Sequence, residues 1–223
     1  MRAVRTTAAR AALTMVTVAA LGSGCSAVLD PVAVAGPTVA VSGDAASALA
    51  TLPVKGRAPK TGYTREQFGQ AWADVDHNGC DTRNDVLHRD LTAIQVRPGT
   101  HDCVVVAGTL ADPYTGTTVA FTKAEASKVQ IDHVVPLAAA WTQGAAAWTT
   151  ARREQFANDP ANLIATESGP NESKGDDTAD QWVPPATAFG CTYARVIVTV
   201  KQRYALTVTQ AELAALGRLL GTC

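Results

Sequence analysis

The residues whose types and spacing could carry out chemistry lie in one window, from Asp132 to Lys174. It holds an Asp-His pair at 132–133, then Asn162, then Asn171 three residues before Lys174. Histidine can activate water near neutral pH, Asp and Asn oxygens suit hard divalent cations, and lysine can hold phosphate as a point charge. These are the groups that phosphodiester hydrolysis needs, because a cation must stabilise the charge developing on the phosphate.

Each of these residues also has an ordinary structural interpretation. Asp132 and His133 could form a hydrogen-bonded pair at the end of a strand, Asn162 could be a turn or cap residue, and Lys174 could be a solvated loop charge. A lone Asp-His pair would carry little information. The order Asp-His, Asn, Asn-x-x-Lys favours the catalytic interpretation.

The same segments resemble the HNH endonucleases, and most of all the secreted bacterial proteins of that family. The resemblance extends over roughly residues 60–210. The segments that carry it are 131–137, 162–163, 171–176 and 182–184, with 78–84 and 112–116 upstream. HNH proteins have a ββα-metal (His-Me finger) fold. The resemblance therefore implies an α+β domain with that core, flanking helices and a β-hairpin.

The resemblance also implies a role for each motif residue. His133 matches the general base, Asp132 the first metal ligand, and Asn171, in place of a histidine, the second ligand. Asn162 matches the residue that braces the loop carrying the base, and Lys174 matches a catalytic basic residue beside the metal-bound phosphate. Two protein ligands leave positions for water and phosphate oxygens, which fits Mg²⁺, with Mn²⁺ as the second candidate. Asn at 171 disfavours tight zinc binding.

Two polar segments nearer the N-terminus each leave two interpretations open. Arg83 could contact the substrate phosphate in a bidentate manner, or it could form a surface ion pair with a neighbouring aspartate. Asp74, Asp76 and Asn78 match the opening of a Ca²⁺-binding loop, although its twelfth position is Asp85 and not Glu. The alternative is a turn stabilised by hydrogen bonds from Asx side chains.

The elements that must position these residues are a mixture of strands and helices. A β-branched run over 103–110, a turn at 112–116 and a second run over 117–121 predict a hairpin. Helices are predicted over 192–206 and 209–220, the second with Thr209 as its cap. The fold class is therefore α+β.

The N-terminus indicates export. Three arginines and an apolar run over 11–22 predict a signal peptide over 1–24. Residues 25–58, rich in small residues, predict a flexible tether, and 59–223 the nuclease domain. Leu21 to Cys25 resembles the lipobox of bacterial lipoproteins, with Leu one position further from Cys than usual. That resemblance implies a lipid anchor through Cys25 on the extracytoplasmic face of the membrane. The alternative is ordinary secretion.

The four remaining cysteines fit an oxidising compartment. Three pairings exist, and Cys80–Cys103 with Cys191–Cys223 is favoured because each pair closes a local segment. A zinc site is the alternative, but the chain has no Cys-x-x-Cys pair.

The overall charge limits how a nucleic acid could be held. The 223 residues carry a formal charge of −1, and loss of the three N-terminal arginines leaves 16 basic and 20 acidic residues. An anionic substrate must therefore be held by a local cluster or a metal ion. The sequence predicts an exported, monomeric, metal-dependent endonuclease acting on DNA, with RNA as a second candidate substrate, and with low sequence specificity. The alternatives are a non-catalytic envelope lipoprotein that uses the HNH scaffold as a binding module, and a calcium-binding wall protein.

Overall fold

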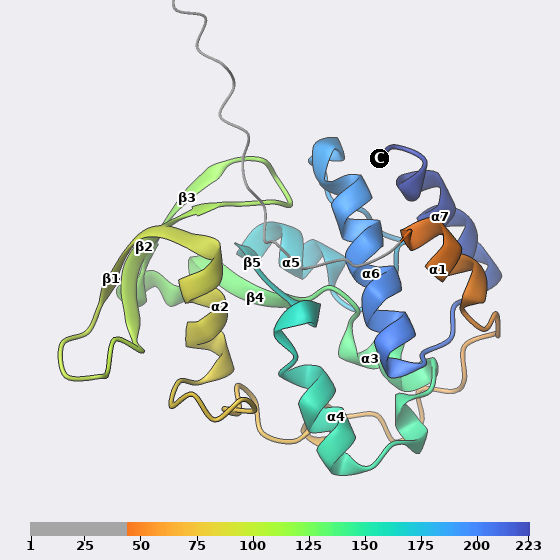
Figure 1. The fold of residues 1–223 in the computed structure, drawn as a ribbon, viewed down its shortest axis with the longest axis horizontal. Coiled ribbons are helices and arrows are strands. Elements are labelled where there is room, and N and C mark those ends of the chain that lie inside the picture. The colour runs from red at the N-terminus through yellow and green to blue at the C-terminus, as the bar shows by residue number, and fades with distance from the viewer. Residues whose placement is uncertain (1–43) are drawn as a thin grey trace, which may run out of the picture. The chain divides into compact units, whose positions relative to one another are not determined.

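The computed structural model describes residues 44–223, so the predicted signal peptide and Cys25 lie outside the described residues. This part of the chain contains both helices and strands (Figure 1). The helices are α1 (Ala45–Thr51), α2 (Thr82–Asp90), α3 (Leu137–Thr142), α4 (Thr150–Ala157), α5 (Ser168–Lys174), α6 (Gly190–Tyr204) and α7 (Gln210–Leu220). The strands are β1 (Leu91–Val96), β2 (Val105–Ala111), β3 (Thr118–Thr122), β4 (Val129–His133) and β5 (Leu163–Glu167). The α+β class is confirmed.

The first sheet is antiparallel, with strand order β1-β2-β3. Strands β2 and β3 form the predicted hairpin across the turn at 112–116, where Gly116 N donates to Asp112 O. Helix α2 begins at its cap Asp81, whose side chain accepts from Asn84 N. The apolar face of α2 packs on this sheet through Val86 and Leu87, within a core that also includes Phe121.

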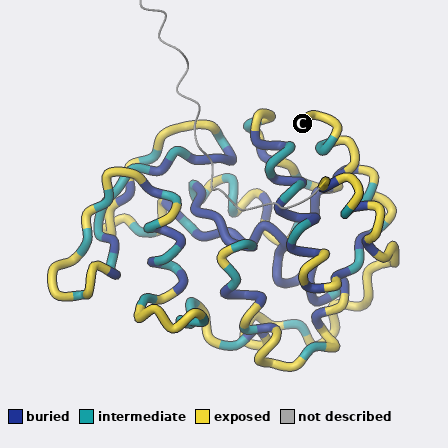
Figure 2. The backbone as a smooth tube through the Cα atoms, viewed as in Figure 1, coloured by how far each residue is buried: buried dark blue, intermediate teal, exposed yellow. Residues whose placement is uncertain are grey.

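Strands β4 and β5 form a separate antiparallel pair, with His133 opposite Leu163 and Val129 opposite Glu167. Helix α5 follows β5 directly, so the chain forms two strands and a helix around the motif residues. The two strands are buried along nearly their whole length (Figure 2). In Figure 1 they run between the three-stranded sheet and the C-terminal helices, so the pair is supported from both sides.

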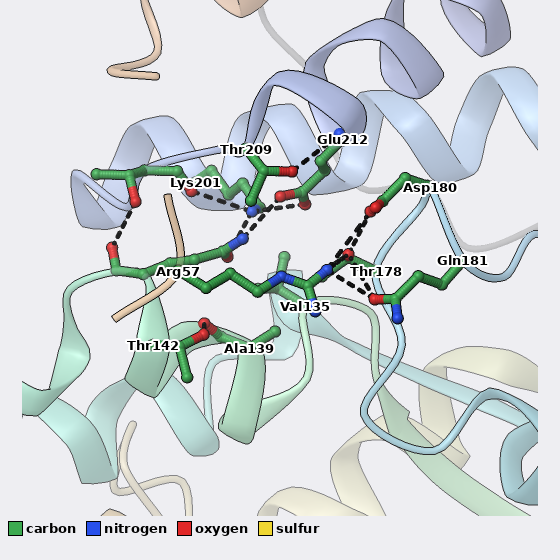
Figure 3. A network of polar contacts seen from close by, with 12 residues as sticks. Arg57, Val135, Ala139, Thr142, Thr178, Asp180, Gln181, Lys201, Thr209 and Glu212 are labelled. Carbon is green, nitrogen blue, oxygen red and sulfur yellow. Dashed lines mark hydrogen bonds and ion pairs between the residues drawn. The ribbon is translucent and has the colours of Figure 1, made fainter. Parts of the chain in front are cut away.

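The C-terminal helices make the larger hydrophobic core. Helix α6 is its centre, and its buried residues include Tyr193, Ile197 and Val200. Thr209 caps α7 by accepting from Glu212 N at 3.1 Å, as the sequence predicts. Inside this core Lys201 Nζ lies 2.6 Å from Glu212 Oε1, which joins α6 to α7 (Figure 3).

The folded unit begins earlier than the sequence analysis places it. Leu49 and Leu52 in and after α1 are buried in the C-terminal core. Lys55 N donates to Val208 O, and Ala58 N donates to Thr142 O. The prediction of a tether over 25–58 is therefore wrong for residues 45–58, because their few apolar side chains find partners on α6 and α7.

Two disulfides join Cys80 to Cys103 and Cys191 to Cys223, the pairing that the sequence analysis favours. The first links the segment before α2 to the segment before β2. The second links the start of α6 to the segment after α7. Within residues 44–223, no helix combines the length and apolar character that crossing a membrane requires.

Candidate active site

The motif residues come together at the ends of β4, β5 and α5. Asp132 and His133 end β4, Asn162 directly precedes β5, and Asn171 and Lys174 lie on α5. Asp132, His133 and Asn171 line one open cavity of about 360 Å³. Asn162 and Lys174 are buried behind its wall, with exposed fractions of 0% and 1%. The sequence therefore identified residues that share one site.

The His133 imidazole has a defined tautomer. Its Nε2 lies 2.8 Å from the carbonyl oxygen of Ala157, at the end of α4. A carbonyl only accepts, so Nε2 carries the hydrogen and Nδ1 keeps its lone pair. Burial lowers the pKa of His133 to about 4, so the ring is neutral at physiological pH. A neutral ring with a free Nδ1 can accept a proton from water.

Asn162 fixes the backbone that follows His133. Its Oδ1 accepts from Val135 N at 2.8 Å, and its Nδ2 donates to Val135 O at 3.2 Å. Its main-chain carbonyl also accepts from Val134 N at 2.8 Å. The side chain thus braces the loop after the base. The imidazole itself is held by Ala157, a backbone contact that side-chain motifs cannot predict.

The Asp132 carboxylate is held by two buried groups. The hydroxyl of Tyr114 donates to its Oδ2 at 2.6 Å, and Lys174 Nζ lies 2.9 Å from each carboxylate oxygen. Burial raises the pKa of Tyr114 well above its usual value, so the phenol keeps its proton and donates. Tyr114 lies in the hairpin turn at 112–116. That turn is part of the predicted hairpin and of the resemblance, but Tyr114 itself had no predicted role.

The position of Lys174 fits neither a phosphate contact nor a solvated loop charge, the two interpretations that the sequence offers. Its ammonium also donates to His133 O at 2.8 Å, and its side chain is fully buried. It is not among the residues that line the cavity. Lys174 is therefore a fixed charge behind Asp132, not a solvated loop charge. The assignment as a phosphate contact is corrected, because its donors are already used inside the fold.

A divalent cation in this cavity would be held by Asp132 and Asn171. Asn171 donates through Nδ2 to Gln130 Oε1 at 2.7 Å, and its Oδ1 has no hydrogen-bond partner among residues 44–223. In the same part of the chain, no three His, Cys, Asp or Glu side chains are grouped to hold a metal ion. The side-chain oxygens of Asp132 and Asn171 fit a hard ion whose coordination is completed by water and phosphate oxygens, and the Asp176 carboxylate lines the same cavity.

Two arginines line the same cavity. Arg83 donates from Nη2 to Val129 O at 3.0 Å, and it forms no ion pair within the part of the chain that is described. The surface ion pair offered as its alternative is therefore absent there. Arg65 lies exposed at the start of the short helical turn Arg65–Phe68, also without an ion pair among these residues. The sequence analysis did not identify it. Two cations at one cavity can hold a phosphate.

The indole of Trp72 stands beside the base. Its ring is nearly parallel to that of His133, at 16°, with centroids 6.3 Å apart. Its backbone is left-handed, with φ of 59°, which is unusual for a bulky residue and concentrates at functional sites. Nothing in the sequence distinguished Trp72, because its conformation depends on packing remote in sequence.

The acidic segment at 74–78 forms a hydrogen-bonded turn. The Asp74 carboxylate accepts from Asn78 N at 3.1 Å and Gly79 N at 3.0 Å. The amide of Asn78 donates to Asp76 at 3.2 Å and to Asp85 at 3.1 Å. This is the Asx-stabilised turn that the sequence analysis gave as the alternative to a Ca²⁺ loop.

Comparisons with known proteins support a nuclease site. The C-terminal domain of the GmrSD restriction endonucleases matches residues 81–219, which include all the motif residues. The chain is 42% identical over 189 residues to an uncharacterized secreted protein of Arthroderma benhamiae, covering 84% of this chain and 88% of that protein. No solved structure matches. The chain belongs to the family defined by the C-terminal domain of the GmrSD restriction endonucleases, a nuclease family.

Proposed function

We propose that the protein is an exported, metal-dependent endonuclease of the HNH type, which hydrolyses phosphodiester bonds of DNA, and also of RNA, with low sequence specificity. One observation carries the proposal. His133, whose Nδ1 has no hydrogen-bond partner among residues 44–223, lines the same cavity as two residues with oxygen ligands, Asp132 and Asn171, and two cations, Arg65 and Arg83. Family membership supports the nuclease, and the secreted relative supports export.

In the proposed reaction, His133 Nδ1 takes a proton from a water molecule in the cavity. The water oxygen attacks phosphorus, the bond from phosphorus to the 3′-oxygen breaks, and the 3′-oxygen takes a proton from solvent. Arg65 and Arg83 bind the non-bridging phosphate oxygens. A divalent ion bound by Asp132 and Asn171, with Mg²⁺ preferred over Mn²⁺, supplies electrostatic stabilisation of the charge on the phosphate.

Three residues position these groups without touching the substrate. Tyr114 and Lys174 hold the Asp132 carboxylate in one orientation. Asn162 fixes the loop that follows His133. All three are buried, so their contribution is to geometry and electrostatics.

Plasmid cleavage by the disulfide-bonded protein tests the proposal, with Mg²⁺, Mn²⁺, Ca²⁺ or EDTA. We expect nicking with Mg²⁺ that EDTA abolishes, and a loss of about 100-fold or more in His133→Ala. His88→Ala is the matched control, because His88 binds the Cys103 carbonyl away from the cavity. Cleavage by His133→Ala at the wild-type rate would exclude the mechanism.

One observation favours a second candidate, a non-catalytic binding module. Both oxygens of Asp132 already accept hydrogen bonds from the protein, as in a purely structural buried carboxylate. A folded wild-type protein that binds DNA in a gel-shift assay but cleaves none with any metal would support this candidate over the enzyme.

Attachment to a membrane through Cys25 is a separate proposal, and free secretion is its alternative. Palmitate labelling of wild-type and Cys25→Ser protein in the producing cell distinguishes the two, because only a lipidated Cys25 incorporates label that the variant loses.

A further inference from the structure

A second cavity, of about 380 Å³, adjoins the candidate active site. It shares Arg65, Trp72, His133 and Leu137 with the first cavity, so the two are continuous around the base. Its own wall adds Phe68, an aromatic side chain. The proposed mechanism places a phosphate in the first cavity and leaves the second without a role.

Asn158 lines this second cavity and has an unused hydrogen-bond acceptor. Its exposed fraction is 1%, and its Oδ1 has no partner within residues 44–223. Its Nδ2 donates to Gln70 O at 3.1 Å and Glu154 O at 3.0 Å. Two carbonyl partners identify that atom as nitrogen, so the unpaired atom is the oxygen. Buried polar atoms without a partner are rare in folded proteins and call for an explanation.

Trp72 supplies a flat apolar surface where the cavities meet. It lines both of them, and its left-handed backbone fixes the indole beside His133. Aromatic side chains beside a positively charged groove are the usual means of binding bases of single-stranded nucleic acids, because every base has a face that can stack.

We propose that the second cavity binds the nucleobase next to the scissile phosphate, an inference that rests on the proposed nuclease function. The base stacks on Trp72, and an exocyclic amine donates to Asn158 Oδ1 once the side chains that cover this buried atom move aside. Adenine, cytosine and guanine carry such an amine, whereas thymine and uracil do not. Arg65 lies in both cavities and holds the phosphate that connects the base to the reaction centre.

The proposal restricts the form of the substrate. A base inside this cavity cannot remain stacked and paired in a duplex, so it must come from a single strand or be extruded at an energetic cost. Single-stranded DNA and RNA are therefore the preferred substrates of this site.

Ligand binding to the wild-type protein in EDTA tests the base site without any cleavage. Isothermal titration compares AMP, purine riboside 5′-monophosphate, which lacks the amine, and ribose 5-phosphate, which lacks the base. We expect AMP to bind at least about tenfold more tightly than ribose 5-phosphate, as base stacking predicts. We expect AMP to bind about two- to tenfold more tightly than the purine riboside, as one neutral hydrogen bond predicts. Equal affinity for AMP and ribose 5-phosphate would overturn the proposal, whether or not the protein cuts plasmid.

Variants locate the binding to this cavity. Trp72→Ala should bind AMP no more tightly than ribose 5-phosphate, and Trp72→Phe should restore part of the difference. Asn158→Ala should bind AMP and the purine riboside equally. Asn158 is buried, so binding by Asn158→Ala is interpreted only if the circular dichroism of the variant matches that of the wild type. If it does not match, the comparison of the three ligands on the wild-type protein is the test. Unchanged AMP affinity in Trp72→Ala would also overturn the proposal.

Discussion

His133 is held neutral by its surroundings, and this has a consequence for stability. The folded protein lowers its pKa from 6.5 to about 4, because burial penalises the charged ring. Between pH 6.5 and about 4, His133 is protonated in the unfolded chain but neutral in the folded protein. The stabilising contribution is therefore present above pH 6.5 and is lost as the pH falls towards 4.

We expect the free energy of unfolding in EDTA to fall by about 1.4 kcal/mol per pH unit through this range because of His133. Urea unfolding between pH 4 and 7 measures it. The matched variant His133→Gln keeps a donor for Ala157 O but does not titrate. The difference between the two proteins in the slope of unfolding free energy against pH gives the contribution of His133. Equal slopes would contradict the lowered pKa.

Tyr114 contributes one hydrogen bond to Asp132 and is buried at the back of the site. We expect Tyr114→Phe to fold and to lose about 10- to 100-fold in Mg²⁺ affinity or in kcat, as is typical when a partner of a metal ligand is removed. A titration of cleavage rate with Mg²⁺ measures both. Tyr63→Phe is the control, because Tyr63 is half-buried and its hydroxyl has no hydrogen-bond partner in the described structure. Equal losses of Mg²⁺ affinity or kcat in Tyr114→Phe and Tyr63→Phe would show that the effect does not depend on the hydrogen bond to Asp132.

The grouping of three candidate site residues could be predicted from the sequence, whereas the contacts that support them could not. Asp132, His133 and Asn171 line the expected cavity because the motif spans two strands and the helix that follows them. The contact between His133 and the Ala157 carbonyl could not be predicted, because a main-chain carbonyl is present in every residue. Arg65 reaches the site through packing of a distant segment, and such contacts depend on the tertiary fold.

At the scale of elements, the sequence predicted those helices and strands whose turn or capping residues lie within a few positions of them. The hairpin of β2 and β3 and helix α7 have turn and capping residues that act within a few positions. Helix α5 begins in the polar segment 168–180 and follows Glu167, which makes no side-chain cap bond. Its position comes from packing on β4 and β5.

The Cys80–Cys103 disulfide anchors the start of α2, which carries Arg83. Replacing both cysteines with serine should destabilise the fold by about 2–4 kcal/mol and also raise KM for DNA, because Arg83 is then less well fixed. The Cys191–Cys223 pair spans a similar separation, 32 residues against 23, but links α6 to the segment after α7. Its double serine variant should show a similar loss of stability with unchanged KM. Denaturation and steady-state kinetics distinguish the two effects.

At the scale of the whole molecule, residues 44–223 form two hydrophobic cores with the β4–β5 pair between them. Ile131 and Leu163 belong to the core under the three-stranded sheet, and Ile164 belongs to the core around α6. Residues from both sides therefore support one site. A change deep in either core should act on the reaction only through the stability of the fold.

The buried pair of Lys201 and Glu212 offers a test of that expectation (Figure 3). Glu212→Leu leaves a buried ammonium without its counter-charge, so we expect about 3–5 kcal/mol of lost stability. Lys201→Met combined with Glu212→Leu should recover most of that loss. Well below the melting temperature, kcat and KM should stay at wild-type values in both, and thermal unfolding with kinetics measures this.

The anchoring of Arg83 by the Cys80–Cys103 bond has a consequence for the producing cell. Thiols stay reduced in most cytosols, so in the proposed exported protein this bond forms only after the chain has left the cytosol. Under the proposed function, Arg83 becomes a fixed phosphate-binding residue only after export, so the nuclease is weakest in the compartment that holds the cell's own chromosome. Covalent maturation outside the cytosol would then protect the cell from its own enzyme without a dedicated inhibitor.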